Sequence, residues 1–277
     1  YDTNIGDSNY NSRLPYLLNV GKTFPTKKLT AFLKGKDDED VSLSKYYPDG
    51  NIAVMRNTFE KKNAAYLMLS ASPFDGHSHE DLGNVIFYAY SRPLITDSGR
   101  YGYSQSSISS HLKEVSAHNT IEIEGAPYTP HSKSGSQITA FISGPLFDYA
   151  ESTANISEEI NAIHKRCVFF LKSTPLAIVS DFVSTSVLAQ KFKQNWHFLP
   201  EANMSYDFSN HVKTNFEKDG NITILCPDAE LLECDYDIFS SGYGMAKKNS
   251  KASFVKHGDK AEMTTLLFPY DGEEPKV

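Results

Sequence analysis

The chain has 277 residues, of which 40% are apolar, so it can bury a large core and is expected to be globular rather than disordered. Its formal net charge of -7 argues against a nucleic-acid-binding protein, because phosphate contacts need clustered lysine and arginine side chains. It contains no apolar run of the roughly 18 residues that a membrane-spanning helix needs. The sequence begins at Tyr1 with neither an initiator methionine nor the layout of a signal peptide, and we therefore expect it to be part of a longer protein.

Two short helices are predicted in residues 1–40. Apolar residues at helical spacing occur twice there, at Leu14, Leu17 and Leu18 and again at Leu29, Phe32 and Leu33. The second helix is expected to end near Gly35, where the acidic run 37–40 forms a solvated break. We place residues 1–45 in a helical segment with its linker and residues 46–277 in a β domain.

From Asn51 onward, short β segments separated by Gly, Pro, Asn and Asp predict a mainly β fold. The expected strands lie within 64–72, 84–90, 119–125, 136–144, 165–173, 175–183, 192–200, 221–227, 229–235 and 261–270. A hairpin turn is expected in 172–177, between two of the most apolar segments. So many strands with so few helices favour a large antiparallel two-sheet β-sandwich, preceded by a short helical remnant.

The segment 119–125 alternates apolar and acidic residues. Ile121 and Ile123 are expected to face the core, and Glu122 and Glu124 the solvent. This pattern is typical of an antiparallel sheet with one wet face.

The cysteines do not predict a functional site. Cys167, Cys226 and Cys234 are odd in number and lack CxxC spacing, so neither a disulfide framework nor a cysteine metal site is indicated. We expect core thiols, with one Cys226–Cys234 bridge left open.

The acidic net charge still allows an anionic ligand, because a few local cations such as Arg92, Arg100 and Lys113 could line one site.

Two histidines one residue apart, His77 and His79, precede the apolar segment 84–90. If the strand begins with them, both side chains point to one face, because residues two apart on a strand share a face. Asp97 and His118 follow at the edges of predicted strands, from which neighbouring strands can converge. Two imidazoles and a carboxylate suit zinc, with water in a fourth position.

Each of these residues also has a structural interpretation. His-x-His alone is a weak signal, Asp97 in the sequence DSG is typical of a turn, and His118 can simply begin a strand. A structural role is favoured for the remaining histidines, His111, His131, His164, His197, His211 and His257. The aromatic residue next to His197, Trp196, suits either a sugar-binding surface or the hydrophobic core, and so leaves the role of His197 open.

The segments GHSHEDLGNVIFYAYSRPLITDSGRYGY (76–103) and SAHNTIEIEG (116–125) resemble the signature of the heparinase II/III-like polysaccharide lyases. In that family the signature lies in a β-sandwich domain that follows a helical toroid. The match is densest over 76–125, where motif order, strand placement and the RPL..D.G turn agree. IGDSNY near the start resembles the end of the toroid, so the resemblance implies that residues 1–45 are the end of that domain and its linker. After Pro127 only a generic run of sandwich strands matches.

The resemblance implies a catalytic residue and a structural metal. His77 falls where the sandwich contributes a histidine to the active cleft. His79, Asp97 and His118 fall where a structural zinc is held. Zinc bound there would tie three segments together and fix His77 beside them.

Substrate-binding residues are implied by the same motif. Arg100, Tyr101 and Tyr103 lie in the matching segment after the glycine turn. The two tyrosines either line the cleft or pack beneath it.

The implied reaction is β-elimination on uronic-acid polysaccharides, heparin/heparan sulfate-like or alginate-like, in the bacterial periplasm or extracellular space. The C5 proton, alpha to a carboxylate, is very weakly acidic, so that carboxylate must be neutralised before a Tyr or His base can remove the proton and the C4 oxygen can depart. In the family, the neutralising Asn, one His and the catalytic Tyr come from the toroid, which is largely absent here. The isolated chain is therefore expected to be inactive.

Two other classes of protein remain as alternatives. Cupin-like metalloenzymes also present His-x-His, a carboxylate and a later His on a β scaffold. They usually carry a Glu four or five residues after the second His, where this chain has Gly83 and Asn84. A non-catalytic carbohydrate-binding sandwich is the other alternative, and saccharide binding without turnover would favour it.

Overall fold

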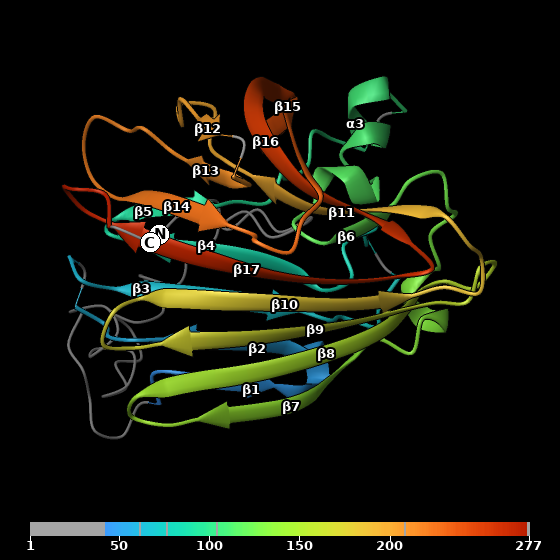
Figure 1. The fold of residues 1–277 in the computed structure, drawn as a ribbon, viewed down its shortest axis with the longest axis horizontal. Coiled ribbons are helices and arrows are strands. Elements are labelled where there is room, and N and C mark those ends of the chain that lie inside the picture. The colour runs from blue at the N-terminus through green and yellow to red at the C-terminus, as the bar shows by residue number, and fades with distance from the viewer. Residues whose placement is uncertain (1–41, 61, 76, 104, 208, 276–277) are drawn as a thin grey trace, which may run out of the picture.

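The computed structural model describes residues 42–275 except 61, 76, 104 and 208. The helices expected before Gly35 lie outside the described residues, so the boundary proposed at residue 45 stays a prediction. The described part consists largely of antiparallel strands, arranged in three hydrogen-bonded sheets. Figure 1 shows the long strands of the largest sheet running side by side.

The three sheets have five, eight and four strands. In spatial order, the five-stranded sheet contains β1 (Lys45–Tyr47), β2 (Ile52–Arg56), β3 (Ala65–Ser70), β4 (Asn84–Ala89) and β5 (Arg92–Ile95). The eight-stranded sheet contains β12 (Ser205–Asp207), β13 (His211–Lys213), β14 (Asn221–Leu225), β17 (Lys260–Tyr270), β10 (Leu176–Ser184), β9 (Ala162–Leu171), β8 (Phe147–Ser157) and β7 (Gln137–Ser143). The four-stranded sheet contains β15 (Leu231–Gly242), β16 (Met245–Gly258), β11 (Gln190–His197) and β6 (Ile121–Ile123).

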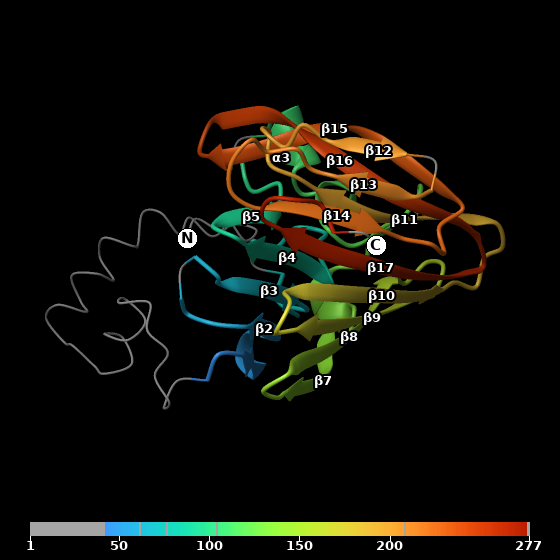
Figure 2. The same cartoon turned by 60° about the vertical axis from the view of Figure 1, so that its left-hand side comes forward.

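Helical structure in the described residues is limited to short pieces. One turn of α-helix, α3 (Ser107–His111), begins after Ser106, whose side chain accepts a hydrogen bond from the Ser109 N–H. Three 3-10 turns complete the set: η2 (Pro48–Gly50), η3 (Val115–Ala117) and η4 (His131–Lys133). Both views place α3 beside the β15–β16 hairpin (Figures 1 and 2). No helix in the described ranges is long and apolar enough to cross a membrane.

One hydrophobic core joins all three sheets, because buried residues of each belong to a single packed cluster. The two smaller sheets are also linked by backbone hydrogen bonds: Val85 N–H donates to the Asn119 carbonyl (3.3 Å), and Thr96 N–H donates to the His197 carbonyl (3.1 Å). The predicted antiparallel β-sandwich is thus confirmed. Its second layer differs from the expected single sheet in being divided into two connected sheets.

Each predicted β segment contains a strand, and the expected turn lies between β9 and β10. Ile121 and Ile123 are buried, as predicted, whereas Glu122 is partly exposed and Glu124 is exposed. The longest strands that the sequence did not predict are β8 and β16. β8 alternates small residues with polar ones, and β16 begins with four exposed residues, 245–248, two of which are lysines, so neither has a strong apolar pattern.

Two expectations change with the structure. All three cysteines are free, so the Cys226–Cys234 bridge is not formed. The strand expected to begin at His77 begins instead at Asn84, after a loop, 71–83. The two histidines of this loop do not share a strand face: His77 is exposed, whereas His79 is 5% exposed.

Candidate functional site

The loop 71–83 is anchored at several points. At its end, Gly83 has φ +75° and donates from its N–H to the Ser70 carbonyl (2.9 Å). Glycine suits this position, because a Cβ would lie 3.3 Å from the ring of His164 and would strain a left-handed backbone. Nearer the middle, Asp75 accepts a hydrogen bond from the Ser132 N–H (3.0 Å). The conformation around the two histidines is therefore fixed by contacts on both sides.

Glu80 attaches the same loop to the segment that follows α3. Its N–H donates to the Lys113 carbonyl (2.8 Å), and its carboxylate accepts from the Val115 N–H (2.9 Å). Burial raises the pKa of Glu80 above its usual range. Position 80 thus links the loop to the chain that leads into His118.

His77 lies on the exposed side of this loop. Its backbone φ is +60°, a left-handed conformation that is unusual for a residue with a side chain. Its ring centroid lies 5.4 Å from that of Tyr103, which is 60% exposed. The guanidinium of Arg100 lies 4.0 Å from the centroid of the same tyrosine ring. An imidazole, a phenol and a cation are thus assembled at one surface.

A residue that the sequence did not single out, Tyr243, completes this surface. Its ring lies 5.9 Å from that of Tyr103 in an edge-on arrangement, and the Arg100 guanidinium lies 4.8 Å from its centroid. We call His77, Arg100, Tyr103 and Tyr243 the aromatic edge. Tyr243 sits in the loop of the β15–β16 hairpin, where no motif marks it.

The hairpin is held against the segment after Asp97 by three hydrogen bonds. Ser240 N–H donates to the Ser98 carbonyl, and Ser240 Oγ donates to the Arg100 carbonyl, both at 2.8 Å. Gly244 N–H donates to the carbonyl of Tyr101, which is half-buried (2.8 Å). The position of the hairpin tip is therefore set by the backbone of the motif itself.

On the inner side of the loop, His79, Asp97 and His118 form a buried group. Asp97 and His118 are fully buried, and His118 Nδ1 lies 2.8 Å from Asp97 Oδ2. The ring centroids of His79 and His118 are 5.2 Å apart. Asp97 also accepts hydrogen bonds from Asn84 Nδ2 (2.7 Å) and from the Gly99 N–H (2.8 Å).

Charge pairing stabilises the ionised forms in this group. Burial raises the pKa of Asp97, but the charge and hydrogen bond of His118 outweigh it, so the pKa lies below its usual value. Burial lowers the pKa of His118, but the charge and hydrogen bond of Asp97 outweigh it, so that pKa is raised. The pair is thus held together electrostatically as well as by geometry.

The donor types of this group suit zinc. His118 Nε2 is buried, and no hydrogen-bond partner for it is found among the described residues, which is the state of an imidazole nitrogen whose lone pair can serve a metal. Both Asp97 oxygens are engaged in hydrogen bonds. Across 42–275, apart from the four positions not described, no three His, Cys, Asp or Glu side chains already form a group that could hold a metal.

Asn119 connects the buried group to both of the smaller sheets. Its N–H donates to Asn84 Oδ1 (3.0 Å), and its amide donates to the carbonyls of Val85 and Thr96 (2.9 Å each). Its amide oxygen accepts from the His197 N–H (2.7 Å). His197 is fully buried, in agreement with the structural interpretation of this residue.

A buried ion pair supports the same region from the eight-stranded sheet. Arg166 binds both carboxylate oxygens of Asp181 (2.7 Å each), and His164 Nε2 lies 2.7 Å from the same carboxylate. Burial raises the pKa of Asp181, but the charge of Arg166 outweighs it and the pKa is strongly lowered. Arg166 also donates to the carbonyls of Gly83 (2.7 Å) and Asn119 (2.6 Å), which flank the buried group.

A family model described as Heparinase II/III-like, C-terminal, matches residues 40–270. The chain belongs to this family. Membership sets aside the cupin-like alternative. A comparison with curated protein sequences finds no match.

Solved structures of heparin lyases share the fold of this heparinase II/III-like domain. The heparan sulfate lyase HepC from Pedobacter heparinus has a TM-score of 0.86 at 20% identity, covering 99% of this chain and 44% of that one. A heparinase III structure has a TM-score of 0.81 at 15% identity, covering 98% and 45%. At these identities the likeness shows the fold, and the chain spans less than half the length of either enzyme.

The structure divides the predicted site residues of this heparinase II/III-like domain into two groups. Three of them, His79, Asp97 and His118, are brought together inside the fold. His77, Arg100 and Tyr103 meet at the surface, while Tyr101 lies half-buried beside them. The sequence indicated both groups of residues, but it did not indicate that one group is buried and the other is exposed to solvent.

Proposed function

We propose that this domain is the β-sandwich portion of a polysaccharide lyase that cleaves uronic-acid-containing polysaccharides, of the heparin/heparan sulfate or alginate type, by β-elimination. The observation that carries the proposal is the exposed His77 beside Tyr103, whose ring Arg100 also contacts, in a member of this family. The structural relatives named heparan sulfate lyase and heparinase III support it.

The reaction needs a cation and proton-transfer groups. In β-elimination the C5–H bond breaks, a C4–C5 double bond forms, and the C4 oxygen leaves and takes up a proton. A positive charge near the uronate carboxylate makes the C5 proton easier to remove, because it stabilises the carbanion-like transition state. We assign His77 to contact the reacting sugar as a proton-transfer group and Arg100 to the uronate carboxylate.

The tyrosines supply binding surface. Tyr103, with its exposed ring, would pack on a sugar face, while the half-buried Tyr101 would shape the surface from below. The remaining catalytic groups would come from an N-terminal helical toroid of the same protein. We therefore propose that the isolated chain has no appreciable lyase activity, and that the complete protein works in the bacterial periplasm or outside the cell, where such polymers are met.

We further propose a structural zinc bound by His79, Asp97 and His118 with a water. When bound, zinc would supply a cross-link and no step of the elimination. The buried Nε2 of His118 and the neighbouring ring of His79 support this assignment. Elemental analysis of protein purified without chelators tests it, and a metal-free protein that is no less stable than the zinc-loaded one would contradict it.

The decisive experiment compares the two histidines in the complete protein, by measuring unsaturated product through its ultraviolet absorbance. His77→Ala should lower kcat by about 100-fold or more, as expected for loss of a proton-transfer group, and should leave the melting temperature and metal content nearly unchanged. His79→Ala should lose metal first and lower the melting temperature, with activity falling as a consequence. His257→Ala, a change at an exposed histidine, is the matched control.

Three outcomes would change the assignment. If the His77 variant loses metal while the His79 variant keeps it, the two roles are exchanged. If neither variant changes turnover, both histidines are structural. Saccharide binding by a wild-type protein that forms no product would favour a carbohydrate-binding domain over a lyase.

A further inference from the structure

The loop 71–83 is held from two sides by different parts of the chain. On one side, Glu80 binds the segment 113–118, which leads into His118. On the other side, the loop binds residues 128–136, which we call the support segment. The two sides contact different parts of the loop and therefore control different side chains.

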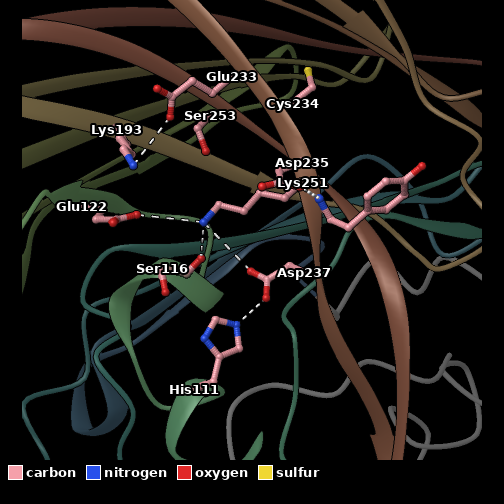
Figure 3. Close-up of a pocket in the computed structure, with 11 residues that line it drawn as sticks. His111, Ser116, Glu122, Lys193, Glu233, Cys234, Asp235, Asp237, Lys251 and Ser253 are labelled. Carbon is pink, nitrogen blue, oxygen red and sulfur yellow. Dashed lines mark hydrogen bonds and ion pairs between the residues drawn. The ribbon is translucent and has the colours of Figure 1, made fainter. Parts of the chain in front are cut away.

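The first side is braced by the charges of a pocket. Ser116 lines this pocket, which lies on the four-stranded sheet and in which charged side chains point toward one another (Figure 3). Lys251 donates to the Ser116 carbonyl (2.7 Å) and lies 4.0 Å from the carboxylate of Asp237. Asp237 in turn contacts His111, at the end of α3. These contacts hold the chain that leads into the buried group, so this side of the loop serves the buried group rather than His77.

The support segment is fixed to β8 by backbone hydrogen bonds. Thr129 N–H donates to the Ile156 carbonyl (3.0 Å), and Asn155 N–H donates to the Ser134 carbonyl (2.8 Å). The 3-10 turn η4 lies between these two contacts. Because β8 pairs with β7 on one side and with β9 on the other, we expect the support segment to be as rigid as the sheet that carries it.

The support segment contacts the loop near both of the loop's ends. Ser136 Oγ donates to the Ala71 carbonyl (3.0 Å), and the Leu82 N–H donates to the Tyr128 hydroxyl (2.6 Å). Ala71 and Leu82 lie close to β3 and β4, whose pairing also holds them. The two contacts therefore fix where the loop leaves the five-stranded sheet and where it returns.

A third contact, in the middle of the loop, is made by Asp75, an exposed residue two positions before His77. Its carboxylate accepts a hydrogen bond from the Ser132 N–H (3.0 Å). Hydrogen bonds from the side chain and the N–H of Ser132 lower the pKa of Asp75 below its usual value, so at neutral pH it is an ionised and therefore strong acceptor. The carbonyl of Asp75 accepts from the N–H (3.3 Å) and the Oγ (2.9 Å) of Ser78.

His77 lies between the two residues that the last hydrogen bonds join. A hydrogen bond from the Ser78 N–H to a carbonyl three residues earlier is that of a β-turn, and such a turn can place its third residue at positive φ, as His77 has at +60°. A residue with a side chain keeps this conformation only where its surroundings enforce it. The turn thus sets the direction of the His77 side chain, and the Asp75 carboxylate sets where the turn lies.

We propose that Asp75 is a positioning residue for His77: its carboxylate, bound to Ser132, fixes the turn that carries the proton-transfer group. The proposal rests on the proposed function, which supplies the reaction in which His77 takes part. Asp75 acts through the geometry of His77 and does not itself contact the reacting sugar. Position matters here because proton transfer needs hydrogen-bond distance, and a displacement of about 1 Å can lower a rate about 100-fold.

The test compares Asp75→Ala with Asp75→Asn in the complete protein, by measuring unsaturated product from heparan sulfate and from alginate. Asp75→Ala removes the acceptor of the Ser132 N–H and should lower kcat about tenfold, with KM nearly unchanged because Arg100 and Tyr103 are untouched. Asp75→Asn keeps an oxygen that can accept the same hydrogen bond and should recover most of the loss. Asp259→Ala, at an exposed aspartate between β16 and β17, is the matched control and should change neither constant.

Two further measurements separate positioning from a loss of structure. The melting temperature and the metal content of the Asp75→Ala variant should equal those of the wild type, because Asp75 is exposed and the buried group is held through Glu80 instead. Amide hydrogen exchange, followed by mass spectrometry, should become faster in the peptides that contain Ser78 and Ser132. This exchange is measured without substrate, so it does not depend on the lyase assignment.

The outcomes distinguish the two proposals. If the wild-type protein forms no product, the lyase assignment fails and the positioning role falls with it, whatever the exchange shows. If the wild type is active and Asp75→Ala keeps the kcat and the exchange of the Asp259→Ala control, the positioning role is overturned while the lyase assignment stands. A fall in kcat that comes with loss of metal or a lower melting temperature, or that Asp75→Asn does not recover, would also overturn it and would show that Asp75 supports the fold.

Discussion

The loop 71–83 carries two histidines whose side chains lie in opposite environments. His79 enters a region where Asp97 and His118 are fully buried and paired with each other. His77, two positions earlier, faces solvent beside the exposed Tyr103. The left-handed backbone at His77 breaks the alternation of a strand, and this break separates the two side chains.

The comparison shows how one short segment can serve both stability and recognition. In the buried region, removal of one partner leaves another polar group without compensation, which is costly in a dry interior. At the aromatic edge, contacts are made by exposed rings and a cation, whose loss solvent can largely compensate. Changes in the first region should therefore act on folding, and changes in the second on binding.

The largest loss of stability is expected for Arg166→Met. It leaves Asp181 buried without its main counter-charge and removes one hydrogen bond each from the Gly83 and Asn119 carbonyls, at a cost of about 3 to 5 kcal/mol. Denaturant unfolding of the complete protein measures the change. Lys247→Met, which removes a cation 3.5 Å from the carboxylate of Glu201 in a pair whose side chains are both exposed, is the control and should cost far less.

A smaller loss is expected for Asn119→Ala, of about 2 to 3 kcal/mol. The substitution leaves two buried carbonyls, of Val85 and Thr96, and the His197 N–H without their hydrogen bonds. The melting temperature gives the first measure, and the exposed change Asn63→Ala is the control. Equal stability of the two variants would show that Asn119 does not join the two smaller sheets.

The fold was predictable because its core strands carry apolar residues bounded by turn formers. β8 and β16 were not, because neither carries a strong apolar pattern, although each pairs with a strand next to it in the chain. The helices before Gly35 and the domain boundary stay predictions, since they fall outside or at the limit of the described residues.

The sequence pointed out those residues of the candidate site that lie in short motifs, and it did not point out the others. His77, His79, Asp97 and His118 stand in or beside recognisable segments, although their burial depends on the loop conformation that ends at Gly83. Tyr243 comes from the loop of the β15–β16 hairpin, more than a hundred residues later in the chain. Hydrogen bonds from the hairpin to the segment after Asp97 bring it to the aromatic edge, and sequence patterns do not specify these contacts.

A pH-dependent change of about 1 kcal/mol in the free energy of unfolding is expected from the contact between His111 of α3 and Asp237 of β15. The hydrogen bond to Asp237 raises the pKa of His111 above 6.5. The stability that protonated His111 contributes is thus fully present below pH 6.5, its ordinary pKa, and is lost as the pH rises through the raised pKa of the folded state. The melting temperature should fall as the pH rises above about 6.5, and His111→Gln should flatten this part of the profile; an unchanged profile would contradict the assignment.

The smallest effect on stability is expected at the aromatic edge. Tyr243→Ala removes exposed contacts to Tyr103 and Arg100 and should change the free energy of unfolding by less than about 0.5 kcal/mol. It should nevertheless weaken binding of an acidic oligosaccharide about fivefold, as for one aromatic contact. Calorimetric titration checks the binding, and a large loss of stability would place this tyrosine with the buried region instead.

The hairpin that carries Tyr243 has a consequence for how such domains diversify. Gly244, the other residue of its loop, has φ +68°, so a side chain placed there would strain the backbone although it would meet no atom within 4 Å. The backbone on both sides of Tyr243 is held, because Ser240 N–H donates to the Ser98 carbonyl and Gly244 N–H donates to the Tyr101 carbonyl. The Tyr243 side chain is exposed between these two anchors, so a substitution at this one position would change the surface offered to a ligand while leaving the backbone of the hairpin in place.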